Sequence, residues 1–253
     1  MFYDGILFFG FGFALRSSRF DGLIEFTFKT FNKIKGKVMN LMIFGDSYST
    51  YEGYIPEGYG TYYCKNGRED GAPASKIDFE NTWWAKLIKE KDFNLVRNDS
   101  WTGSTICHTG YDGADCSKTK SFIFRYHNLL ESGFFNSNEI DVLLIFGATN
   151  DSWANSPLGD KKTENITSQD LYFVFPAITY LLQELKRVLP KTDVYFIIND
   201  ELKQEIVSHI KSECARLSIS TVELSGIVKE GGHPTVLGMD TIYQQVKKAL
   251  DKE

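Results

Sequence analysis

Serine, glycine, asparagine and histidine residues stand at four places in the chain where polar segments follow apolar ones. Ser47 comes directly after an apolar run, and His233 lies far along the chain. A serine hydroxyl becomes a good nucleophile only when a base takes its proton, and histidine titrates near neutral pH. These two residues predict attack of Ser47 on an acyl carbon, with His233 as the general base.

The other two residues can supply hydrogen-bond donors to the same reaction. Attack on an ester carbonyl places negative charge on its oxygen, and fixed donors must stabilise that charge. The candidates are the backbone N–H groups of Ser47 and Gly103 and the side-chain amide of Asn150. Glycine suits this role because it has no Cβ and lets a ligand approach the backbone closely. The residue types therefore predict an oxyanion hole.

Five apolar segments of strand length are expected to bring these residues together. Helical patterns separate the segments, and alternating strands and helices predict a parallel sheet with helices on both faces. Ligands of such sheets bind beyond the carboxyl ends of the strands. We therefore expect one three-layer α/β/α domain with a five-stranded parallel sheet. The expected strands are residues 41–44, 93–96, 140–146, 194–198 and 220–224.

The expected helices lie between these strands and after the last one. They cover residues 83–88 (after a cap at Asn81 or Thr82), 121–132, 171–189, 202–217 and 235–250. Pro176 should kink or split the third helix, because proline lacks an N–H and clashes with the preceding turn. Loops are expected around these elements, and in them Asp46 and Asp151 should brace turns by accepting backbone hydrogen bonds.

The four polar segments, in this order, resemble the four blocks of the SGNH or GDSL-type serine hydrolase superfamily. The matching segments are residues 45–49 (GDSYS), 98–103 (NDSWTG), 147–151 (GATND) and 232–234 (GHP). The resemblance covers residues 41–235 and implies a flavodoxin-like fold. It also implies Ser47 as nucleophile, His233 as base, and Ser47, Gly103 and Asn150 as oxyanion donors. The implied activity is hydrolysis of esters, often acyl groups on sugars or lipids.

One residue departs from the pattern of this superfamily. Its last block usually has aspartate three residues before the histidine, and this chain has Glu230. A carboxylate at that place orients the imidazole and stabilises its cation. Glu230 can substitute for the aspartate, Asp200 or Glu201 beyond the fourth strand can reach His233 instead, or a backbone carbonyl can orient the ring of a Ser–His dyad.

Aromatic residues on loops near the same sheet edge suggest the substrate. The faces of Trp101, Tyr111 and Trp153 would suit sugar rings, although packing under a loop would use them equally well. We favour a carbohydrate O-acetyl esterase that forms an acyl-enzyme on a small-molecule or glycan ester. The alternatives are a lipase or thioesterase of the same superfamily, or a non-catalytic module that binds acylated glycans.

Composition argues against several other classes of partner. Hydrophobic residues make up 42% and charged residues 24% of the 253 residues, as in globular proteins. The net charge of −5 argues against binding to nucleic acid or an anionic membrane. No apolar run reaches the ~18 residues of a membrane span. The four cysteines lack zinc-site spacing, and no phosphate-binding glycine loop occurs, so we expect neither a metal nor a cofactor. The sequence makes no prediction of oligomeric state.

Residues 1–38 differ from the rest of the chain. They are rich in phenylalanine and glycine, and their apolar run, residues 6–15, has no basic segment before it. Met39 stands two residues before the first expected strand. We interpret residues 1–38 as an N-terminal extension outside the working fold and residues 39–253 as the hydrolase domain. A cytoplasmic protein is expected, or a secreted one if residues 1–38 act as a signal.

Overall fold

A five-stranded parallel sheet forms the centre of the structure, a computed structural model that describes residues 37–65 and 77–252. The predicted extension, residues 1–38, lies almost wholly outside the described residues, and Met39–Glu253 form one compact unit. The strand order is β2-β1-β3-β4-β5, which is the flavodoxin-like order. The strands are β1 (Asn40–Gly45), β2 (Asn94–Ser100), β3 (Val142–Phe146), β4 (Asp193–Ile198) and β5 (Ser220–Glu223).

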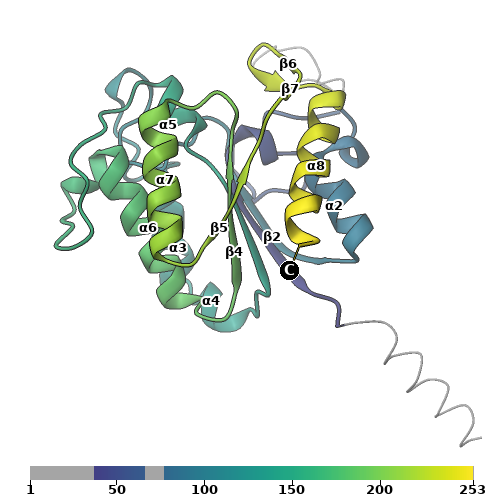
Figure 1. Cartoon of the computed structure of the whole chain (residues 1–253), viewed down its shortest axis with the longest axis horizontal. Coiled ribbons are helices and arrows are strands. Elements are labelled where there is room, and N and C mark those ends of the chain that lie inside the picture. Colours follow the sequence, from purple (N-terminus) through teal and green to yellow (C-terminus); the bar gives the residue numbers. More distant parts are fainter. Residues whose placement is uncertain (1–36, 66–76, 253) are drawn as a thin grey trace, which may run out of the picture. The chain divides into compact units, whose positions relative to one another are not determined.

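Helices cover both faces of this sheet, as Figure 1 shows, so the predicted three-layer α/β/α architecture is confirmed. Side chains of β1 alternate between two apolar cores, because successive residues of a strand point to opposite faces. Met42 and Phe44 pack into one core, and Leu41 and Ile43 into the other. The first core includes α3 (Phe122–Glu131), α6 (Val174–Val188) and α7 (Gln204–Arg216), and the second includes α2 (Trp83–Lys91) and α8 (Val236–Leu250).

Strand β2 is longer than its apolar residues indicate. The sequence predicted its end at residue 96, whereas the strand continues to Ser100. The last three residues of this extension are buried, and two of them have clear partners: Asn98 donates to the carbonyl of Ser49, and Asp99 pairs with the buried Arg125. Polar side chains can occupy a buried strand when each finds such partners, which a hydropathy pattern does not reveal.

Pro176 does not interrupt a helix, contrary to the prediction. A short 3₁₀ turn, η4 (Asp170–Tyr172), precedes α6, and α6 begins only at Val174. Pro176 therefore lies in the first helical turn, where the N–H groups have no partner within the helix and proline is tolerated. The N–H groups of Val174 and Phe175 donate instead to the carbonyls of Pro157 and Leu158.

Several short elements complete the described fold, and the sequence did not predict them. They are η1 (Ser47–Ser49), η2 (Phe79–Asn81), η3 (Tyr111–Gly113), α4 (Phe134–Ser137), α5 (Thr149–Trp153), β6 (Lys229–Glu230) and β7 (His233–Pro234). Strands β6 and β7 form an antiparallel hairpin between β5 and α8. Each helix in the described part of the chain is too short or too polar to cross a bilayer.

Candidate active site

Ser47 and His233 lie in hydrogen-bond contact at the carboxyl edge of the sheet. Ser47 begins η1, directly after β1, and is 3% exposed. Its Oγ lies 2.9 Å from Nε2 of His233 on the β6–β7 hairpin. Asp46 caps η1, because its Oδ1 accepts the N–H of Tyr48 at 3.0 Å. The fold thus joins the nucleophile and the base that the sequence indicated.

The other ring nitrogen of His233 faces a backbone carbonyl. Nδ1 lies 3.3 Å from the carbonyl oxygen of Gly231, in the turn of the hairpin. Glu230, the carboxylate predicted to orient the ring, is the cross-strand neighbour of His233, but its side chain is exposed. The other two candidates, Asp200 and Glu201, form ion pairs with Lys229. Of the three alternatives, the geometry therefore matches a backbone carbonyl.

Aromatic rings surround the imidazole of His233. The ring of Tyr62 stacks on it, with centroids 3.5 Å apart and an angle of 8° between the planes. Tyr48 packs at 5.4 Å with a tilted ring, and the edge of Trp153 contacts it at 5.9 Å. These contacts fix the plane of the imidazole, which is half-buried. The sequence did not single out Tyr48 or Tyr62, although the density of tyrosine after Ser47 was a signal for them.

Gly103 lies in the turn that follows β2, at the same sheet edge. Its φ of +68° belongs to the left-handed region that favours glycine, and a Cβ there would lie 3.1 Å from Nζ of Lys120. Neither its N–H nor that of Ser47 donates to another residue in the described part of the chain. Both predicted backbone donors are therefore unpaired there.

The amide of Asn150 is held in one orientation. Asn150 lies on α5, directly beyond β3, and is 3% exposed. Its Oδ1 accepts a hydrogen bond from the hydroxyl of Tyr111 at 2.9 Å, and its Nδ2 donates to the carbonyl of Ser104 at 3.0 Å. An amide nitrogen has two N–H groups, so one remains for a ligand. Burial raises the pKa of Tyr111, which keeps its hydroxyl protonated as a donor.

Two of the three aromatic residues predicted to bind substrate lie beside these groups. Tyr111 contacts Asn150 and Trp153 contacts His233, and their side chains are 40% and 36% exposed. Trp101 instead stacks on Tyr59, with ring centroids 4.2 Å apart. The fold thus places Tyr111 and Trp153 where a bound molecule would meet them, and uses Trp101 at least in part to hold a loop.

Two buried aspartates brace the turns of the site, as the sequence predicted. Asp46 holds η1, and burial raises the pKa of its carboxyl to about 7. Asp151 accepts the N–H groups of Ile106 and Cys107 at 2.8 and 3.1 Å, and burial raises its pKa as well. Both carboxyl groups hold loops in place and are shielded from solvent.

The remaining histidines and the cysteines lie in buried or hydrogen-bonded positions outside this group of residues. His108, His127 and His209 are hydrogen-bonded to Ser121, Tyr180 and Thr179 respectively. All four cysteines are buried, and none forms a disulfide with another described residue. Among the described residues, no group of three or more His, Cys, Asp or Glu side chains is arranged to hold a metal ion.

Comparisons with known proteins agree with this fold. A family model for GDSL-like lipases and acylhydrolases matches residues 39–250. A crystal structure from Bacteroides ovatus, of a protein classed as a GDSL-like lipase, is 39% identical with a TM-score of 0.77, covering 86% of this chain and 100% of that one. A similarly classed protein from Bacteroides uniformis is 38% identical with a TM-score of 0.78, covering 87% and 99%.

More distant structures share the fold. An acetyl xylan esterase from the rumen bacterium Butyrivibrio proteoclasticus is 16% identical with a TM-score of 0.53, and the match covers 85% of this chain and 63% of that one. Among curated proteins, none matches the chain significantly.

Proposed function

Because the chain belongs to the GDSL-like lipase and acylhydrolase family, and is therefore an ester-hydrolysing enzyme, we propose that it is a serine esterase that removes acetyl groups from carbohydrate hydroxyls. One observation carries the proposed serine chemistry. Ser47 Oγ and His233 Nε2 are 2.9 Å apart, which is the distance over which a hydroxyl passes its proton to an imidazole.

The proposed reaction begins when Ser47 Oγ attacks the ester carbonyl carbon and its proton moves to Nε2 of His233. Negative charge then develops on the carbonyl oxygen, where the N–H groups of Ser47 and Gly103 and the Asn150 amide stabilise it. Collapse of this intermediate breaks the ester bond, and the leaving alcohol takes the proton from His233. Water repeats the sequence on the acyl-enzyme, which releases the acid and restores Ser47.

Support for an acetylated carbohydrate comes from the side chains around the site. Tyr111 and Trp153 present exposed aromatic surface next to Asn150 and His233, and aromatic faces pack well against sugar rings. The acetyl xylan esterase shares the fold of this chain. Because the two sequences are only 16% identical, this likeness supports the proposal at the level of fold alone.

A lipase is the second candidate, because the proteins at 39% and 38% identity are classed as GDSL-like lipases. A lipase should prefer long acyl chains, whereas an O-acetyl esterase should prefer acetyl. Turnover of nitrophenyl esters from acetate to palmitate separates them, and release of acetate from acetylated xylan tests the carbohydrate directly. A preference for chains of eight carbons or more would overturn the proposed substrate.

A fluorophosphonate probe tests the nucleophile, because it reacts covalently with activated serines. We expect the label on Ser47, identified by peptide mass spectrometry, and its loss in Ser47→Ala. Ser49→Ala is the matched control: Ser49 lies in the same 3₁₀ turn and is fully buried, so its loss should leave labelling intact. Binding of acylated glycan without labelling or turnover would instead indicate the non-catalytic module.

A further inference from the structure

The hairpin that carries His233 cannot hold its own position. Strands β6 and β7 have two residues each, and isolated hairpins are at best marginally stable in water. The hydrogen bond between Ser47 and His233 therefore depends on whatever fixes the hairpin from outside. We propose that Lys229 and Tyr48 are positioning residues, which clamp the hairpin to the loop after β4 and to the nucleophile turn. This inference rests on the proposed function, since it assigns both residues a role in that reaction.

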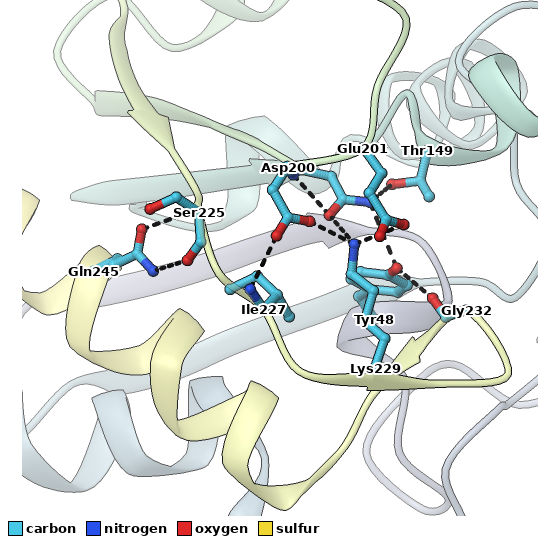
Figure 2. Close-up of polar contacts among 10 residues, drawn as sticks. Tyr48, Thr149, Asp200, Glu201, Ser225, Ile227, Lys229, Gly232 and Gln245 are labelled. Atoms are coloured by element: carbon cyan, nitrogen blue, oxygen red, sulfur yellow. Dashed lines mark hydrogen bonds and ion pairs between the residues drawn. The ribbon is translucent and has the colours of Figure 1, made fainter.

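Lys229 forms the first part of the clamp. Its Nζ lies 2.5 Å from Asp200, 3.0 Å from Glu201 and 3.1 Å from Oδ1 of Asn199, and its side chain is 8% exposed (Figure 2). An ammonium group has three N–H donors, and here each finds an acceptor on one loop. Lys229 begins β6, so this loop holds the hairpin strand paired with His233.

The same loop holds the hairpin at a second point. Oδ2 of Asp200 accepts the backbone N–H of Ile227 at 2.9 Å, two residues before Lys229 (Figure 2). Asp200 therefore contacts both the main chain that leads into the hairpin and the side chain of Lys229. Asp200 and Glu201, which the sequence raised as partners of His233, act on it through the hairpin.

Tyr48 forms the second part of the clamp. Its hydroxyl donates to the carbonyl of Gly232 at 2.5 Å, and Nδ2 of Asn199 lies 3.5 Å from the same hydroxyl (Figure 2). Tyr48 follows Ser47, and Gly232 precedes His233. This hydrogen bond thus joins the neighbours of the two reacting residues, and Asn199 connects it to Lys229.

Charge explains why the loss of Lys229 should matter. Asp200 is 17% exposed and Glu201 is 56% exposed, so without the ammonium the carboxylate of Asp200 would be left beside a second carboxylate with little solvent of its own to screen it. Asp200 would then turn toward water and loosen its hold on Ile227. A displacement of about 1 Å between reacting groups can lower turnover ~10²-fold. Because the clamp positions the reacting groups and includes none of the residues proposed to bind substrate, the loss should fall on kcat rather than on KM.

Lys229→Met is the principal test, because it keeps an apolar stem of similar length and removes the charge and the N–H donors. We expect kcat for nitrophenyl acetate, and the rate of fluorophosphonate labelling, to fall by about 10- to 100-fold with KM within about twofold. Lys229→Arg, which keeps the charge and the donors, should restore most of kcat. Lys211→Met is the matched control: Lys211 pairs with Glu223 at 2.7 Å on the exposed surface, and its loss should leave kcat unchanged.

Tyr48→Phe tests the second contact and keeps the inference falsifiable if Lys229→Met does not fold. It retains the ring and removes the hydrogen bond to Gly232, so kcat should fall in the same manner while the protein stays folded at the assay temperature. Wild-type kcat in both variants would contradict the proposed positioning role. A fall in kcat that is explained entirely by a smaller fraction of folded protein would contradict it as well. An inactive and unlabelled wild-type enzyme would instead overturn the proposed function.

Discussion

Asn150 illustrates how single residues are prepared for the proposed reaction. Tyr111 fixes its amide oxygen and the carbonyl of Ser104 takes one of its N–H groups, so the second N–H is held in place without a partner of its own in the described structure. A donor that is already oriented loses no conformational freedom when negative charge develops next to it. In the proposed reaction, the hydrogen bonds around Asn150 would therefore serve the transition state.

Asn150→Ala should lower kcat by on the order of 10²–10³, because it removes one oxyanion donor. KM should change little, since the donor acts mainly on the charge that forms during reaction. Tyr111→Phe leaves the Asn150 amide in place and removes only the hydrogen bond to its oxygen, so kcat should fall less in this variant than in Asn150→Ala. Steady-state kinetics on nitrophenyl acetate measure both, and a larger loss in Tyr111→Phe than in Asn150→Ala would contradict the assignment.

At the residue scale, the sequence could predict that Ser47, Gly103, Asn150 and His233 lie at one sheet edge, because parallel strands gather their carboxyl ends there. It could not identify what orients His233. In the structure, the carbonyl of Gly231 faces Nδ1 of His233 from a turn, while the side chain of Glu230 stays exposed. No spacing rule records the direction of a backbone carbonyl in a turn.

At the scale of elements, the β6–β7 hairpin depends on its two glycines. Gly231 and Gly232 have φ values of +56° and +80°, and a two-residue hairpin turn of type I′ requires positive φ at both positions. A Cβ on Gly231 would meet nothing within 4 Å, whereas one on Gly232 would lie 3.0 Å from the ring of Trp153. A side chain at either position would therefore strain the backbone, but only one at Gly232 would also clash with a neighbouring ring.

Gly232→Ala should therefore impair the enzyme more than Gly231→Ala. Both substitutions place alanine at positive φ, at a cost of about 1 kcal/mol or more. Only Gly232→Ala must also displace Trp153, which contacts His233, so kcat should fall further in this variant. Parallel measurement of kcat and melting temperature separates strain from displacement, and equal kcat values would argue against a role for this contact.

Strands and helices could be predicted from the sequence where the burial of apolar residues alone determines them. The apolar runs of β1, β3 and β4 predicted these strands, because strands covered on both faces need apolar residues on both. The polar end of β2 was missed because Asn98 and Asp99 find buried partners. Helix α6 was predicted too long because the apolar pattern runs through η4, and the hairpin was missed because strands of two residues carry no periodic signal.

At the scale of the whole molecule, Asp46 couples stability to pH. Its pKa rises from 3.8 to about 7 because the carboxyl is fully buried. Between these values the folded protein holds a proton that the unfolded chain has lost. The contribution of Asp46 to stability is therefore complete below pH 4 and declines as the pH rises toward 7, by up to ~1.4 kcal/mol per pH unit.

Asp46→Asn should remove this dependence while keeping an oxygen that can accept the N–H of Tyr48. From pH 5 to pH 7, the free energy of unfolding of the wild type should fall by about 2 kcal/mol more than that of the variant. Urea denaturation at the two pH values measures the difference. Asp112→Asn, at an exposed position, is the control and should follow the wild type. If the free energy of unfolding changes equally with pH in all three proteins, Asp46 does not hold the expected proton.

The central claim is that Ser47 and His233 act as one unit, and a double-mutant cycle in kcat/KM tests it most directly. Residues that act as a unit show strongly non-additive losses. We predict that Ser47→Ala and His233→Ala each lower kcat/KM for nitrophenyl acetate by at least ~10³-fold, and that the double variant is no slower than the Ser47→Ala enzyme. Losses that multiply in the double variant, or near-normal turnover without His233, would contradict the account.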